Sequence, residues 1–128
     1  MMSFSADKFN VFVVDDDLHV LESLRFLLET TGFNVRTFRS GAALLDQVAS
    51  KQADCFVINY KMASMNGIDL TTRLHERNIV APIILVTGYP DENIASKATA
   101  AGIRDVLFKP HLEDSLVARI LEVIRETP

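Results

Sequence analysis

The stretch Val11-Phe12-Val13-Val14-Asp15-Asp16-Asp17 joins an unbroken apolar run to a run of carboxylates. A continuous apolar run of this length is typical of a strand that is buried on both faces of a parallel sheet. The carboxylates come where such a strand ends, and ligands of parallel sheets bind at the carboxyl ends of the strands. The stretch therefore predicts a parallel α/β sheet with an acidic pocket at that edge.

Further short runs repeat this signal along the chain at residues 34–38, 55–58, 83–86 and 106–108. The last three of these runs are continuously apolar, which predicts strands buried on both faces. The run at 34–38 differs, because Val35 and Thr37 alternate with Asn34 and Arg36. This alternation predicts an edge strand with one wet side.

Helical patterns separate the runs, as in Leu21, Leu24 and Leu28 after the first. The ends of these helices are signalled by capping side chains, first-turn acids and terminal glycines: Asp17, Ser40, Asn66, Asp91, Glu92, Glu113, Asp114, Gly32 and Gly102. Five strand–helix units in sequence predict right-handed crossovers and helices on both faces of the sheet. The expected fold is α/β, flavodoxin-like and doubly wound, with a five-stranded parallel sheet in the order 2-1-3-4-5.

Length and composition suit a single globular domain over residues 1–128, with 48% hydrophobic and 23% charged residues. The net charge of −4 argues against nucleic-acid binding, so Arg36 and Arg39 are interpreted as a wet edge. The lone Cys55 cannot form an internal disulfide and is interpreted as a core residue. Residues 1–9 are not typical of a signal peptide, and no apolar stretch is long enough to span a membrane, so we expect a cytoplasmic location.

Polar residues directly follow four of the apolar runs, among them Asp15, Asp16, Asn59, Thr87 and Lys109. Any one of these polar residues is explained by the exposure of strand ends to water. As a set, however, their side chains complement one another chemically. The two adjacent carboxylates can hold Mg²⁺, the hydroxyl can bond a phosphoryl oxygen, and the ammonium can pair with either anion. The set predicts a phosphoryl-accepting site in which Asn59 stands where a nucleophile is needed.

The pattern resembles the receiver domain of two-component response regulators over residues 10–124. The resemblance is carried by the acidic pair Asp15-Asp16, by Thr87-Gly88, by Lys109-Pro110, and by the loop of residues 58–67, which is similar to the phosphoacceptor loop. It implies a Mg²⁺ site at Asp15, Asp16 and Lys61, switch or phosphoryl-contact roles for Thr87 and Lys109, and a histidine kinase as phosphodonor.

Three departures from the family pattern alter these expectations. Asn59 replaces the acceptor aspartate, Ala63 replaces a loop proline, and Val106 replaces the aromatic switch residue. A neutral amide is a poor nucleophile, so we expect no phosphoryl transfer at Asn59, and the loss of a carboxylate predicts weak or absent Mg²⁺ binding. We expect Lys109 to pair with Asp16 and hold the pocket shut. Val106 has no ring that could follow a movement of Thr87.

The favoured function is a receiver-like signalling module without enzymatic activity. Its expected partners are a sensor histidine kinase, another signalling protein, or a second copy through the fourth and fifth helices and the fifth strand, but neither nucleic acid nor membrane. The first alternative is a normal receiver in which Asn59 was introduced to block the acceptor, and Ala63 and Val106 count against it. A Mg²⁺-dependent phosphatase is disfavoured, because the sequence shows no second carboxylate nucleophile or general base beside the pocket. A flavodoxin-like cofactor binder conflicts with the aspartates after the first strand, which repel phosphate.

Overall fold

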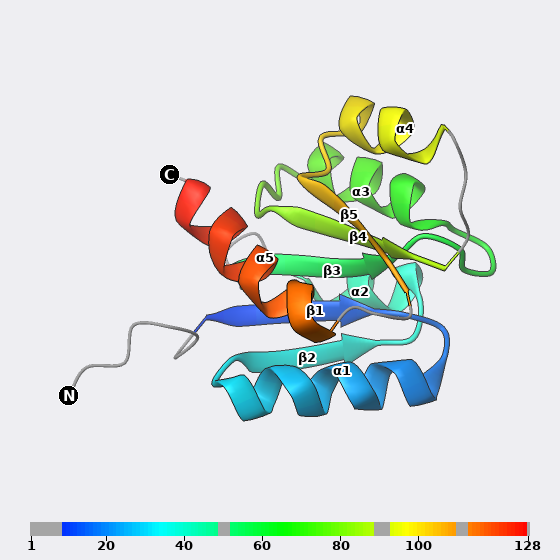
Figure 1. Ribbon diagram of the computed structural model, residues 1–128. Helices are drawn as coiled ribbons and strands as arrows, with labels where there is room; N and C mark the ends of the chain where they lie inside the picture. Colours follow the sequence, from blue (N-terminus) through cyan, green and yellow to red (C-terminus); the bar gives the residue numbers. More distant parts are fainter. Residues whose placement is uncertain (1–8, 49–51, 89–92, 110–112, 128) are drawn as a thin grey trace.

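The computed structural model describes residues 9–48, 52–88, 93–109 and 113–127, and strands alternate with helices along them (Figure 1). The elements are β1 (Asn10–Val14), α1 (Leu18–Thr31), β2 (Asn34–Phe38), α2 (Gly41–Gln47), β3 (Cys55–Asn59), α3 (Gly67–Glu76), β4 (Ile83–Thr87), α4 (Ile94–Ala100), β5 (Asp105–Phe108) and α5 (Glu113–Glu126). Each expected strand and helix is present, with strand ends shifted by at most one residue.

The sheet is parallel throughout and has the order β2-β1-β3-β4-β5, which confirms the predicted flavodoxin-like topology. Helices α1 and α5 cover one face of the sheet, and α2, α3 and α4 cover the other (Figure 1). Because side chains alternate along a strand, β1 supplies both cores: Val11 and Val13 pack under α1 and α5, while Phe12 and Val14 face the other layer.

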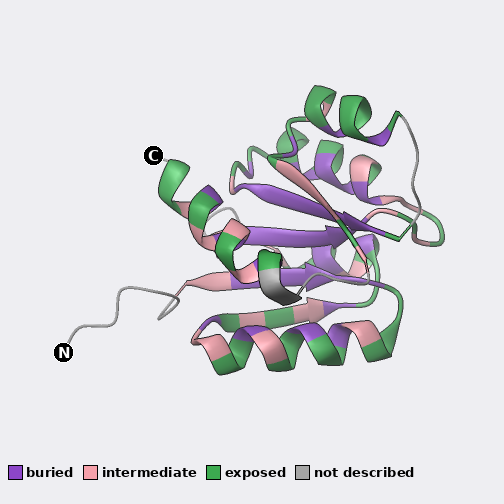
Figure 2. Cartoon of the chain, in the orientation of Figure 1, coloured by how far each residue is buried: buried purple, intermediate pink, exposed green. Residues whose placement is uncertain are grey.

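Burial differs sharply between the central and outer strands (Figure 2). Every residue of β3 and β4 is buried, whereas β2 is exposed at alternate positions, as expected for an edge strand. The expectation that residues 106–108 are buried on both faces is wrong, because Phe108 is 50% exposed. The reason is position: β5 is the last strand of the sheet, and a short apolar run does not reveal whether a neighbour covers it.

Local capping signals account for five helix ends. Asp17, Ser40 and Asn66 accept hydrogen bonds from the first backbone amides of α1, α2 and α3, as predicted. Gly32 and Gly102 have positive φ angles of 117° and 86°, which suits the left-handed ends of α1 and α4. The predicted helix openers Asp91 and Glu92 lie outside the described residues, as do Pro110 and the side chains of Glu113 and Asp114.

Cys55 is fully buried, as expected for a core residue. Burial raises the pKa of its thiol, and the negative charge of neighbouring Asp54 raises it further. In the described part of the chain, no helix is both long enough and apolar enough to cross a membrane.

Candidate functional site

A polar hollow of about 580 Å³ opens at the carboxyl ends of the strands. Its walls come from the segments after β1, β3, β4 and β5 and from the start of α1. They are Asp15, Asp16, Asp17, Val20, Asn59, Lys61, Gly88 and Lys109. The parallel sheet therefore gathers residues that lie far apart in sequence.

Asp15 is the most deeply buried residue of this pocket. It is 2% exposed, and its backbone amide still bonds to β2 by donating to the Phe38 carbonyl oxygen at 3.1 Å. Its Oδ1 accepts from the backbone amide of Asp17 at 3.0 Å, and its Oδ2 accepts from Lys109 Nζ at 3.0 Å. Both carboxylate oxygens thus have a donor, as a buried charge requires.

The expectation that Lys109 pairs with Asp16 is wrong, because its ammonium pairs with Asp15. Asp16 is exposed at the bend between β1 and α1. Asp15 directly follows β1, and its side chain points into the pocket. Successive side chains of an extended chain point to opposite sides, so the side chain of Asp16 points away from Lys109. Asp17 accepts from the backbone amide of His19 at 2.9 Å, so it caps α1.

Asn59 ends β3, the neighbour of β1, and is 9% exposed. Its Nδ2 donates to the backbone carbonyl oxygen of Lys61 at 2.8 Å. The amide therefore ties the strand end to the loop that follows it. Gly67 lets the start of α3 lie close to this strand end, since a Cβ there would lie 2.7 Å from the Asn59 backbone carbonyl oxygen.

Two of the predicted switch residues do not line the hollow. Thr87 is fully buried at the end of β4, and Val106 is partly buried against the core under α2, α3 and α4. Sequence reasoning did not place Val20 and Gly88 in the wall. Gly88 could have been found as the residue after Thr87, and Val20 as the residue one turn into the helix that Asp17 caps.

The Mg²⁺ that the resemblance implies would need oxygens from Asp15, Asp16 and the Lys61 carbonyl. The Asp15 carboxylate oxygens already accept hydrogen bonds from Lys109 Nζ and from the backbone amide of Asp17. The Lys61 carbonyl oxygen accepts one from the Asn59 side-chain amide. Each of these oxygens keeps a further lone pair, but the Lys109 ammonium already offsets the Asp15 charge and the neutral residue 59 adds no carboxylate, so the residues present fit Mg²⁺ poorly. Among the described residues, no three His, Cys, Asp or Glu side chains form a metal-ion site.

Comparison with known proteins agrees with the geometry. Residues 11–121 match the family model for the response regulator receiver domain. The transcriptional regulatory protein FixJ of Bradyrhizobium diazoefficiens is 35% identical over 93% of this chain and 58% of its own length. The response regulator protein TmoT of Ectopseudomonas mendocina is 34% identical over 92% of this chain and 54% of its length. The chain thus spans a little over half the length of these relatives.

Solved structures show the same architecture. The crystal structure of FixJ-N is 31% identical, with a TM-score of 0.80, and the match covers 94% of this chain and 95% of that one. A CheY-like receiver domain protein from Methanospirillum hungatei gives a TM-score of 0.85 at 24% identity, over 95% of this chain and 96% of its own, which shows the shared fold alone.

Proposed function

This chain belongs to the response regulator receiver domain family of two-component systems, and we propose that it acts there as an interaction module that is not phosphorylated at Asn59. Receiver domains are regulatory signalling modules that interact with sensor histidine kinases. The observation that carries the proposal is the amide of Asn59 at the strand end beside Asp15, bonded to the Lys61 carbonyl oxygen at 2.8 Å.

The amide lacks what phosphoryl acceptance needs. An acceptor carboxylate attacks phosphorus with a charged oxygen and forms an acyl phosphate. The Asn59 side chain is neutral, and its nitrogen is held as a hydrogen-bond donor to Lys61. No phosphoryl group forms a bond at residue 59 in this proposal.

Metal binding is proposed to be weak for a related reason. Receiver domains typically bind Mg²⁺ at the acidic pocket, where the ion offsets the carboxylates. Here Lys109 places its own ammonium 3.0 Å from the Asp15 carboxylate and offsets that charge without a metal. Of the two implied carboxylate ligands, Asp16 is exposed and Asp15 is buried, so Asp16 is the more accessible to Mg²⁺. Bound Mg²⁺ would supply charge neutralisation for an incoming anion.

Signalling in this proposal rests on a static surface. Val106 supplies no ring that could follow Thr87, so the domain offers partners the same face before and after any signal at the pocket. The surface of α4, β5 and α5, where Phe108 is half-exposed, is the proposed contact for a sensor histidine kinase, another signalling protein or a second copy.

Intact mass spectrometry after incubation with Mg²⁺ and a small-molecule acyl phosphate tests the proposal. The native chain is expected to keep its mass, and the Asn59→Asp variant is expected to gain one phosphoryl group. A gain by the native chain, mapped to any residue of the pocket, would sink the proposal. If neither protein gains a phosphoryl group, the loss of phosphoryl acceptance has causes beyond residue 59.

The same variant tests the alternative of a normal receiver with a blocked acceptor. If only the acceptor was changed, phosphorylated Asn59→Asp should also switch, and sedimentation velocity should show a change of association state. Under our proposal it gains the phosphoryl group and its sedimentation stays unchanged, because Val106 transmits no switch.

A further inference from the structure

The outer edge of β2 is open and carries backbone groups ready to pair. Asn34 N donates to Phe9 O at 2.9 Å, and Phe38 O accepts from Asp15 N at 3.1 Å, so both residues pair inward with β1. In a parallel ladder alternate residues bond the same neighbour. The amides and carbonyls of Val35 and Thr37 therefore point away from β1, toward the free edge of the sheet (Figure 1).

A groove of about 470 Å³ runs along this edge and is lined by Arg25, Arg36 and Arg39 together with the rest of residues 35–39 and part of α2. The first two arginines flank the strand from opposite faces of the sheet. Arg25 reaches from α1 and donates to Thr37 Oγ1 at 2.8 Å. Arg36 lies on the α2 side and donates to Gln47 Oε1 at 2.7 Å.

The guanidinium of Arg36 is also held in place by aromatic rings. Its Cζ lies 5.3 Å from the centre of the Phe12 ring and 5.4 Å from that of Phe38. Such contacts orient the guanidinium before any ligand arrives, which lowers the entropic cost of binding.

Arg25 and Arg36 donate to neutral acceptors, and neither forms an ion pair in the described part of the chain. The ion pairs found there use Arg104, Lys109 and Arg119. A guanidinium has five N–H donors in a planar fork that matches a carboxylate, and the bonds to Thr37 and Gln47 each use one of them. A chain of net charge −4 thus gathers positive charge at one edge.

We propose that the β2 edge groove binds an extended acidic segment of a partner protein, which adds as a further strand beside β2. The side chains of an added strand alternate between the two faces. Two consecutive acidic residues would therefore meet Arg25 on one face and Arg36 on the other. This inference is independent of Asn59 and of the α4, β5 and α5 surface.

Arginine on an edge strand has a second possible effect, which is to discourage pairing between copies of the same chain. The two roles differ in their consequences. A guarding arginine repels the equally charged edge of a second copy, and its removal promotes self-association. A binding arginine selects carboxylates, and its removal weakens a defined complex.

Fluorescence anisotropy with the whole chain and a labelled peptide of about eight residues tests the proposal, using a length typical of strands. The peptide carries two consecutive Glu residues flanked by Val and Thr, and its control carries Gln at both positions. Saturable binding of the Glu peptide, about tenfold tighter than the Gln peptide, is expected from two charge-assisted contacts. Equal binding of both peptides, or none, overturns the proposal.

Backbone pairing is tested separately with two N-methylated forms of the Glu peptide. Methyl groups at every second amide block one edge of the added strand and leave the other free. One form should lose binding and the other should keep it. Equal loss or equal retention would leave charge attraction without strand addition and would overturn the proposal.

Arg25→Gln and Arg36→Gln should each weaken binding of the Glu peptide about tenfold, since each removes one charge-assisted contact. The matched control is Arg73→Gln, on the exposed side of α3, which should leave the affinity unchanged. If the edge variants instead self-associate in sedimentation with unchanged peptide affinity, the arginines only guard the edge. A single-stranded oligonucleotide that competes equally well would assign the groove to nucleic acid and refute the proposal.

Discussion

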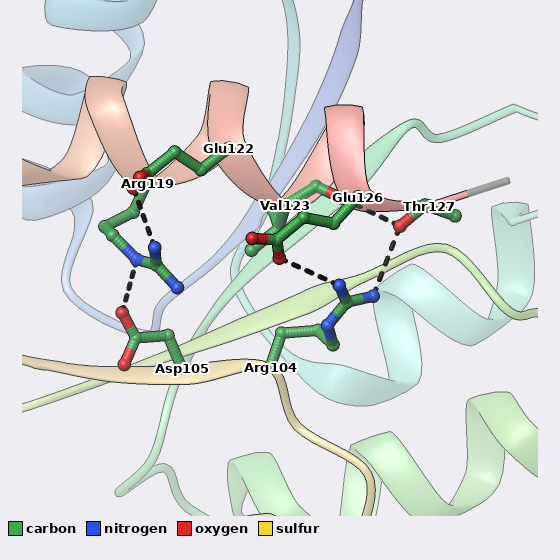
Figure 3. A network of polar contacts seen from close by, with 7 residues as sticks. All are labelled: Arg104, Asp105, Arg119, Glu122, Val123, Glu126 and Thr127. Atoms are coloured by element: carbon green, nitrogen blue, oxygen red, sulfur yellow. Dashed lines mark hydrogen bonds and ion pairs between the residues drawn. The ribbon is translucent and has the colours of Figure 1, made fainter.

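The two ends of β5 are held by ion pairs of different kinds. At the carboxyl end, Lys109 meets Asp15 at 3.0 Å, and the side chain of Asp15 is 3% exposed. At the amino end, Arg119 meets Asp105 at 2.6 Å and Arg104 meets Glu126 at 3.0 Å (Figure 3). The carboxylates there are 32% and 55% exposed.

Water makes the difference between the two ends. A solvated pair contributes about 0–1 kcal/mol to stability, because water stabilises each charge when the partner is absent. Removal of one partner from a buried pair costs about 3–5 kcal/mol, because the remaining charge has no solvent. The ends of β5 therefore use the same chemistry for different purposes: the exposed pairs connect α5 to the start of β5, and the buried pair offsets the charge of Asp15 in the pocket.

At the exposed amino end of β5, each of two arginines contacts two side chains. Arg119 donates both to Asp105 and to Glu122, and these hydrogen bonds, that to Glu122 foremost, raise the pKa of its guanidinium. Arg104 donates to Glu126 and to Thr127 Oγ1 at 3.3 Å, where α5 ends (Figure 3). Both arginines bridge the start of β5 and α5, so we expect graded rather than all-or-none effects when they are removed.

The largest effect is expected for Lys109→Met, which leaves the Asp15 carboxylate buried with only its bond from Asp17 N. We predict a loss of about 2 kcal/mol in the free energy of unfolding, below the full value for a buried pair because the lysine is partly solvated. Urea unfolding measures it. The control is Lys97→Met on the exposed side of α4, which should change little.

A double variant sharpens this test. Asp15→Asn combined with Lys109→Met removes both charges, so it should recover most of the loss. If the double variant is as unstable as Lys109→Met alone, packing of the lysine stem rather than charge explains the effect.

The next effect is expected for Asn59→Asp without metal. A new carboxylate beside Asp15 and Asp16 should lower the free energy of unfolding by about 1 kcal/mol through like-charge repulsion. Millimolar Mg²⁺ should restore the stability of this variant and leave the native chain unchanged, as thermal melts would show. Asn66→Asp is the matched control, since aspartate also caps the start of α3. A Mg²⁺-stabilised native chain would contradict the proposed weak site.

A smaller effect is expected for Arg119→Gln at the exposed end. It removes contacts with Asp105 and Glu122, both of which water can solvate, so we predict a loss of about 0.5 kcal/mol. The difference should shrink at about 1 M salt, where the screening length is near 3 Å. A loss as large as that of Lys109→Met would break the contrast between the two ends.

The smallest effect is expected for Arg104→Gln, about 0.3 kcal/mol, because Glu126 is more than half exposed near the end of α5. Hydrogen exchange of the last turn of α5 is a more sensitive measure than global unfolding. Faster exchange confined to that turn is the expected result, and uniform exchange changes would contradict a local role.

Most of the fold could be predicted because its signals are local. The apolar run of β1 shows strand and burial together, and Asp17, Ser40 and Asn66 mark helix starts by their own side-chain chemistry. The exposure of Phe108 could not be predicted in this way, because it depends on which strand has no neighbour.

In the candidate site, too, the sequence predicts which residues gather but not how their side chains pair. Asp15, Asp16, Asn59, Lys61 and Lys109 could be grouped because strand ends of a parallel sheet share one edge. The predicted partner of Lys109, Asp16, is wrong, because adjacent aspartates look alike in sequence. Which of them turns inward depends on how β1 gives way to α1.

By itself, the sequence of this chain determined the elements, their alternation along the chain and the neutral amide at residue 59, because strand and helix signals are local and the identity of a residue needs no coordinates. Only the tertiary structure decided that Lys109 lies on Asp15, that the Asn59 amide bonds the Lys61 carbonyl, and that Arg25 and Arg36 flank one open edge. These contacts join residues through the direction and burial of side chains, which arise only when the sheet has formed and its helices have packed.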